Sequence, residues 1–185
     1  IPHSSMPSQN SDAALPPPPT LEDDVIELRL LRILGPADAA ARSSAAQFIA
    51  SAPEYRFAIH RRRDGVRVGR IHLRITQGDR VLRAVGHAGY AVDHAHQRQG
   101  HATRAVRLIQ ELAREHALSP LWILIAPDNI ASRRTVERAG FQLVDIVGGS
   151  PEALAIDVAP DVCRYRWDGH QNSAPRPAGP PAARF

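Results

Sequence analysis

The stretch Gly86-His-Ala-Gly-Tyr-Ala-Val-Asp-His-Ala-His-Gln-Arg-Gln-Gly-His-Ala-Thr-Arg-Ala105 determines how the rest of this chain is interpreted. An apolar run ends at Val92, a short polar loop follows to Gln97, and helical spacing begins at Gly100. The segment is therefore predicted to form a strand, a tight loop and the N-terminus of a helix. Unpaired backbone N–H groups and the positive end of a helix dipole meet at such a junction. We expect it to bind a phosphate or pyrophosphate group.

Before this stretch, the pattern predicts strands joined by short turns. Alternating apolar residues indicate strands at 25–31, 55–59 and 66–75 and a fourth strand that ends at Val92. Asp64-Gly65 is a strong signal for a hairpin, and a second turn is expected at 77–79. An alanine-rich helix is predicted from Pro36 to Ser51. The first half therefore resembles an antiparallel meander.

After this stretch, helices alternate with apolar strands. The pattern predicts a helix from Gly100 to Arg114, a buried strand at 121–126, a helix at 128–139 closed by Gly140, and strands at 141–147 and 162–167. The predicted fold class is α/β: a single domain with a mixed, mostly antiparallel sheet flanked by helices. Residues 25–168 form the predicted domain. The proline-rich segments 1–24 and 169–185 are expected to be disordered tails.

Composition limits the functions to consider. The chain of 185 residues has no apolar run of the roughly 18 residues that cross a bilayer, one cysteine and no visible secretory signal, so we expect a cytoplasmic location and no membrane partner. It contains no lysine, which excludes Schiff-base and P-loop chemistry. The formal charge of +4 comes from scattered arginines, so nucleic acid is not expected as a partner. His94-x-His96 and His101 lack further ligands, and no metal is expected.

A second motif follows the predicted strand at 121–126. Asp128-Asn129-Ile-Ala-Ser132-Arg-Arg-Thr-Val-Glu-Arg-Ala-Gly140-Phe141 could by itself be a helix with an asparagine cap and a glycine stop. Together with Gln97-Arg-Gln-Gly100-His-Ala102, in this order, it resembles the GNAT superfamily of N-acetyltransferases. Gly89-Tyr90, on the strand before the loop, is similar to the residues found there in the branch that includes ribosomal-protein N-terminal acetyltransferases.

The resemblance implies acetyl-coenzyme A as the cofactor. It implies that backbone groups of residues 90–92 pair with the pantetheine arm and that N–H groups of residues 98–103 hold the pyrophosphate. Asn129 would contact pantetheine and Ser132 would lie near the thioester sulfur. Arg98 or Arg104 could screen the 3′-phosphate. The implied cofactor-binding residues are Tyr90, Ala91, Val92, Gln97, Arg98, Gln99, Gly100, His101, Ala102, Thr103, Asn129 and Ser132.

The residues that would move protons are less well defined. Many members of the superfamily carry a tyrosine seven residues after the asparagine, and this chain has Val136 there. Ser132 is the nearest substitute by motif position for the acid that protonates the thiolate. His87, whose reference pKa lies near ~6.5, is the candidate base, with Glu54 as a further candidate. A packed strand histidine and a helix-surface serine are the alternatives. Cys163 is expected to be a buried packing thiol.

The implied reaction is acetyl transfer from acetyl-coenzyme A to a primary amine, on a small molecule or a protein N-terminus, by direct attack in a ternary complex. The alternative is a non-catalytic acyl-coenzyme A-binding module with this fold. Without an obvious strong base, a low-pKa amine such as an α-amine is favoured over a lysine side chain. The sequence leaves the acceptor and the oligomeric state open, with a homodimer as one alternative.

Overall fold

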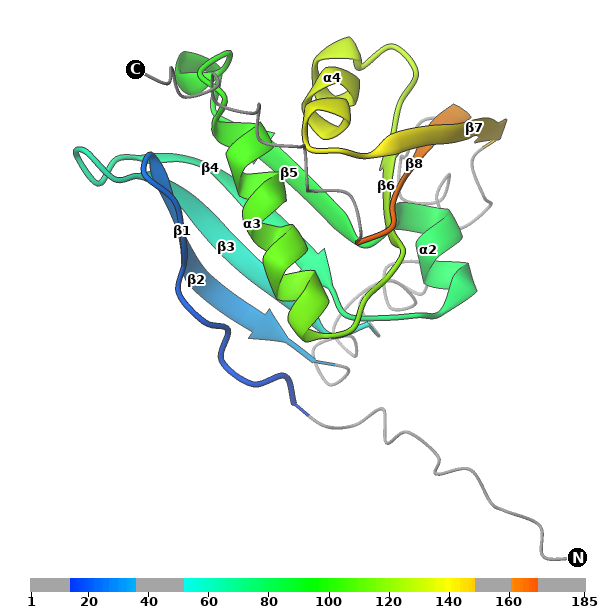
Figure 1. Ribbon diagram of the computed structural model, residues 1–185, viewed down its shortest axis with the longest axis horizontal. Helices are drawn as coiled ribbons and strands as arrows, with labels where there is room; N and C mark the ends of the chain where they lie inside the picture. Colours follow the sequence, from blue (N-terminus) through cyan, green and yellow to red (C-terminus); the bar gives the residue numbers. More distant parts are fainter. Residues whose placement is uncertain (1–13, 36–51, 149–160, 170–185) are drawn as a thin grey trace, which may run out of the picture.

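The computed structural model of the protein describes residues 14–35, 52–148 and 161–169. The strands form two groups, and helices lie against them (Figure 1). The elements in chain order are β1 (Leu21–Glu22), β2 (Ile26–Leu34), β3 (Glu54–Arg61), β4 (Arg67–Arg74), α2 (Asp79–Val85), β5 (Ala88–Val92), η2 (His94–His96), α3 (His101–Glu115), β6 (Leu121–Ile125), α4 (Ile130–Arg138), β7 (Gln142–Gly148) and β8 (Asp161–Trp167). The predicted helix at 36–51 lies outside the described residues.

The first sheet is the predicted antiparallel meander, with strand order β1-β2-β3-β4-β5. The expected β3–β4 hairpin is present: Gly65 has a φ of +69°, which glycine adopts without steric cost. One face of the sheet is apolar, and α3 packs on it with its own buried face (Figure 1). Buried residues of this interface include Tyr55, Phe57, Ile59, Ile71, Leu73, Val106, Ile109 and Leu112.

The second sheet has the order β6-β8-β7 and is also antiparallel. Its inner face carries Cys163, Tyr165 and Trp167, all buried as the alternation predicts. The α/β class with mostly antiparallel strands is confirmed, but the strands form two sheets, and each described pair is antiparallel. The sheets meet where the His87 N–H donates to the Trp122 carbonyl at 2.8 Å. Beyond this point β5 and β6 pair with different sheets.

One predicted element is wrong. The segment expected to begin the fourth strand after the turn at 77–79 is the helix α2, and β5 begins only at Ala88. Gly86 ends this helix with a φ of +68°, and its N–H donates to the Leu82 carbonyl. A Cβ at Gly86 would lie 2.8 Å from the Trp122 carbonyl oxygen. This glycine therefore permits both the end of α2 and the close approach to β6.

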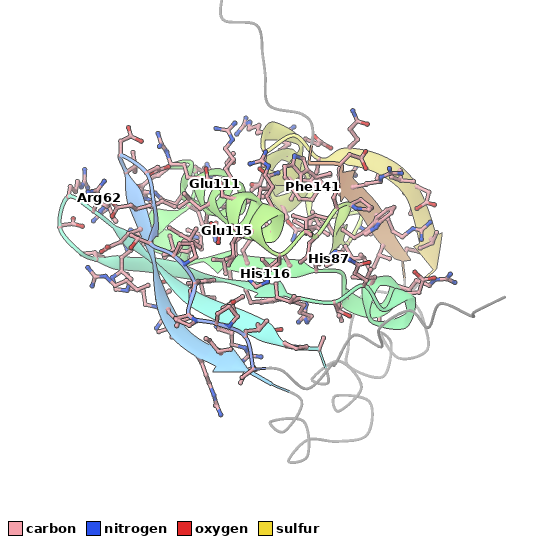
Figure 2. The ribbon with its side chains drawn as sticks, turned by 60° about the horizontal axis from the view of Figure 1, so that its bottom comes forward. Arg62, His87, Glu111, Glu115, His116 and Phe141 are labelled. Carbon is pink, nitrogen blue, oxygen red and sulfur yellow. The ribbon has the colours of Figure 1, made fainter. Side chains whose placement is uncertain are left out.

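The N-terminal boundary also differs from the prediction. Residues 14–24 were expected in a disordered tail, yet they lie against the domain, with Leu21 in the core. The buried Tyr55 explains the attachment, because its hydroxyl donates to the Pro16 carbonyl at 2.7 Å. The same hydroxyl lies 3.1 Å from Nε2 of His116, which Figure 2 labels near the C-terminal end of α3.

No described helix is long and apolar enough to cross a membrane.

Candidate active site

A cavity of about 790 Å³ lies where β5, the loop after it, the start of α3 and one face of α4 come together. These elements are neighbours in Figure 1. The lining residues are Tyr90, Ala91, Val92, His96, Gln97, Arg98, Gly100, His101, Ala102, Thr103, Asn129, Ala131, Ser132, Arg134, Thr135 and Arg138. The cavity thus contains all the predicted cofactor residues except Gln99, which is exposed outside it.

The N-terminus of α3 opens into this cavity without a capping side chain. Its N-cap is Gly100, in the left-handed region with φ +80° and ψ −2°, and no side chain accepts from the first turn. Arg98 also has a positive φ, +59°, which is uncommon for a side chain of its size. Alternating backbone conformations of this kind direct successive N–H groups into one concave site. The loop therefore has the geometry that the sequence predicted for a phosphate site.

Strand β5 forms the second wall. It is the last strand of its sheet and pairs only with β4 among the described strands. Every second residue of such an edge strand points its backbone N–H and C=O groups away from the partner strand. The Gln97 amide donates to the Val92 carbonyl at 3.1 Å and closes the loop that follows the strand. An extended ligand could therefore pair with β5 as a further strand.

Helix α4 forms the third wall, and its start is fixed by two hydrogen bonds. Oδ1 of Asn129 accepts from the Ser132 N–H at 3.1 Å, which is the asparagine cap considered above. The Tyr90 hydroxyl donates to the Ser132 carbonyl at 3.0 Å and holds α4 against β5. Burial raises the pKa of Tyr90, while hydrogen bonds with Ser132 and Thr135 lower it, and the net effect is upward. The tyrosine hydroxyl therefore stays protonated near neutral pH.

Charge in the cavity has one sign. No aspartate or glutamate is among its lining residues, whereas three arginines are: Arg98, Arg134 and Arg138. His101 is 3% exposed, and neither of its ring nitrogens has a partner in the structure. Burial and the nearby Arg61, among other cations, lower the pKa of His101. These features favour a ligand with several negative charges.

The two arginines of α4 were missed by sequence reasoning. Ala131, Arg134, Thr135 and Arg138 share one helix face because they are spaced three and four residues apart. That spacing was visible, but nothing in the sequence indicated which face of α4 would turn toward β5. His96 of η2 also lines the cavity and was not among the implied cofactor-binding residues.

His87 lies outside the cavity, and its surroundings do not suit a base. Both ring nitrogens are engaged: Nδ1 accepts from the Trp122 N–H at 2.9 Å, and Nε2 lies 3.0 Å from the Thr76 carbonyl. The first bond makes Nδ1 the acceptor, so Nε2 carries the hydrogen. Burial lowers the pKa of His87 to about 4. Figure 2 shows His87 inside the molecule, and its bonds join the two sheets. The geometry therefore favours a structural role for His87 over the predicted role as base.

Other residues named from the sequence are also engaged elsewhere. Glu54 lies in ion pairs with Arg56 and Arg74, at 2.5 and 3.0 Å. Burial raises the pKa of Glu54, but the neighbouring cations bring it below its usual value. Arg104 pairs with Asp23 and Asp24 and does not line the cavity. Val136, which occupies the position of the missing tyrosine, and Cys163 are completely buried.

Comparisons with known proteins agree with this geometry. The ribosomal-protein-S5-alanine acetyltransferase of Vibrio fischeri has a similar structure, with a TM-score of 0.55 and 17% identity over 82% of this chain and 97% of that one. A GNAT acetyltransferase of Bacillus anthracis has a TM-score of 0.58 and 14% identity over 81% and 98%. The enzyme AAC(6')-Ib, solved with paromomycin and acetyl-coenzyme A, has a TM-score of 0.56 and 16% identity over 82% and 99%.

At these identities the structural likeness shows the fold. A comparison with curated protein sequences finds no match. The sequence model of the acetyltransferase (GNAT) domain matches residues 21–142, from β1 to the first residue of β7. This match spans about two thirds of the chain and includes both motifs. The chain therefore belongs to the GNAT acetyltransferase family.

Proposed function

We propose that this chain transfers the acetyl group of acetyl-coenzyme A to a primary amine, on a small molecule or at a protein N-terminus, by direct attack in a ternary complex. GNAT acetyltransferases use acetyl-coenzyme A, and the cavity supports the same cofactor here. Its one-sided charge and the uncapped start of α3 suit a polyphosphate. The free edge of β5 suits an extended arm with amide groups. The juxtaposition of these two features is the observation that carries the proposal.

The residues of this chain divide the work. The N–H groups at the start of α3 hold the pyrophosphate, and the backbone of Tyr90 and Val92 orients the pantetheine arm. When bound, the cofactor supplies the thioester carbonyl that the amine attacks. Ser132 lines the cavity at the start of α4, and we assign its hydroxyl to protonating the departing thiolate, while the proton lost by the attacking nitrogen restores the serine hydroxyl. Holding the amine and the thioester in a reactive orientation contributes to the rate of such a site.

Neither predicted candidate base is suited to remove a proton from the acceptor amine. His87 has no free ring nitrogen and Glu54 is paired with two arginines, so neither is suited to deprotonate an ammonium. The acceptor is then best supplied as the neutral amine. An α-amine of pKa ~8 is about one tenth neutral at pH 7, whereas a lysine of pKa ~10.4 is neutral in less than one molecule in a thousand. This difference favours α-amines and other amines of low pKa.

Thiol release from acetyl-coenzyme A tests the proposal. The acceptor panel contains an alanine N-terminal peptide, an aminoglycoside, a polyamine, and one lysine-containing peptide in two forms, with either its α-amine or its side chain blocked. We expect faster release with the free α-amine, and a rate that rises with pH up to the pKa of the acceptor. Binding of acetyl-coenzyme A without thiol release for any amine would instead support the non-catalytic module. Absence of binding at ~1 mM would refute both.

A further inference from the structure

We propose that Arg134 and Arg138 on α4 bind the 3′-phosphate of coenzyme A and so make this chain selective for the intact cofactor. This inference rests on the proposed use of acetyl-coenzyme A. It assigns a function to two arginines of the second motif that were not among the implied cofactor-binding residues. It also assigns the cofactor's negative charges to two separate walls of the cavity.

The first argument is that the side chains of Arg134 and Arg138 lack a partner among the described residues. Ten arginines in the described part of the chain form an ion pair with a carboxylate, as Arg104 does with Asp23 and as Arg164 does with Asp145. Within the described residues, the side chains of Arg134 and Arg138 have no ion pair or hydrogen bond, and both are exposed on the cavity side. Like charges four residues apart on a helix repel each other. An anion between them would turn this repulsion into attraction.

The position of α4 is the second argument. Arg107 of α3 donates to the Arg138 carbonyl at 2.8 Å, and the Gln110 amide donates to the Ala139 carbonyl at 2.9 Å. These bonds fix the C-terminal end of α4 beside the middle of α3. The two arginines therefore face the cavity from a rigid support. A pre-positioned guanidinium binds a phosphate through two parallel hydrogen bonds.

The balance of charge is the third argument. The start of α3 supplies N–H groups and a partial positive charge for the pyrophosphate, together with Arg98 on the same loop. The remaining phosphate of coenzyme A is a monoester with a charge of about −2 near neutral pH. Two arginines without carboxylate partners match that charge. An ammonium acceptor does not suit this wall, because the lining contains no carboxylate.

Calorimetric titration with coenzyme A and with 3′-dephospho-coenzyme A tests the assignment without turnover. The variants are Arg134→Gln, Arg138→Gln and the double variant. The control is Arg83→Gln, which removes an exposed helical arginine on α2, outside the cavity. We expect the double variant to bind coenzyme A about tenfold to a hundredfold more weakly and dephospho-coenzyme A within about twofold of the wild type. The control should bind both ligands as the wild type does.

Three results would overturn the assignment. Equal losses of affinity for the two ligands in the double variant would place the arginines at the pyrophosphate. Unchanged affinities would remove them from the site. A wild type that binds both ligands equally would show that the protein does not recognise the 3′-phosphate. Circular dichroism and thermal unfolding verify that each variant is folded. A wild type that binds neither ligand would refute the proposed function itself, so the two failures are distinguishable.

Discussion

Acidification should destabilise this protein through His87, and removing the imidazole should remove that dependence. His87 is 2% exposed and neutral, with Nδ1 accepting from Trp122 and Nε2 directed at the Thr76 carbonyl. A proton on Nδ1 would break the bond from β6 and place a charge in the interior. His87→Gln keeps a polar side chain but cannot take up the proton.

The magnitude follows from the pKa of His87, which is about 4 in the folded chain against 6.5 in the unfolded one. Above pH 6.5 the imidazole is neutral in both states. Between pH 6.5 and 4 the unfolded state binds a proton that the folded state excludes, so the free energy of unfolding falls as pH falls. Integration from pH 7.5 to 4.5 gives a loss of about 2.5 kcal/mol. His72, with a pKa also lowered to about 4 mainly by burial, adds a loss of the same sign.

Urea unfolding at pH 7.5, 6.5, 5.5 and 4.5 measures this loss. At pH 7.5 we expect His87→Gln to be less stable than the wild type by about 2 kcal/mol, because two buried hydrogen bonds are impaired. The difference should shrink toward zero at pH 4.5. His94→Gln, which removes an exposed imidazole on η2, is the control. Equal pH dependence in wild type and His87→Gln would refute this account, and a large loss of kcat in a folded His87→Gln would restore the histidine as a base.

Four further changes have defined outcomes. Gly100→Glu should abolish coenzyme A binding at ~1 mM in calorimetry, because it adds a negative charge at the start of α3 and a side chain at a φ of +80°. Ser132→Ala should lower kcat for acetylation by about tenfold to a hundredfold and leave the affinity for coenzyme A within about twofold. Gly69→Ala should destabilise the fold by about 1–3 kcal/mol in urea, because its Cβ would collide with a carbonyl oxygen of β5. Tyr55→Phe should cost about 1 kcal/mol and speed proteolysis near Pro16, because it removes the bond that attaches this segment.

The donor side of the site could be predicted from sequence because its signals are local. The end of β5, Gly100 and the start of α3 all lie between Val92 and His101, and Asn129 caps the helix that begins one residue later. Each of these features depends on neighbours in the chain and needs no knowledge of tertiary contacts. The loop and both helices therefore lie where the sequence placed them.

The rest depended on partners distant in sequence. His87 was expected to face the acceptor, but its role is set by Trp122, 35 residues away. Tyr55 attaches a proline segment 39 residues away, which composition alone predicts to be disordered. The error at α2 has a different cause: the strand ending at Val92 was extended back to the turn at 77–79, although the apolar residues at 81, 82, 84 and 85 have helical spacing. Short apolar segments are ambiguous in this way.

The junction between the two sheets has a structural role, and the cavity lies apart from it. His87 and Trp122 join them, and the cavity forms beyond this junction where β5 keeps one unpaired edge. Any base that titrated at the junction would loosen the bonds that keep β5 and β6 in place. A neutral, fully bonded imidazole instead keeps the cleft open over the pH range in which an α-amine loses its proton. The same bonds that remove His87 from proton transfer therefore preserve the geometry on which transfer by proximity depends.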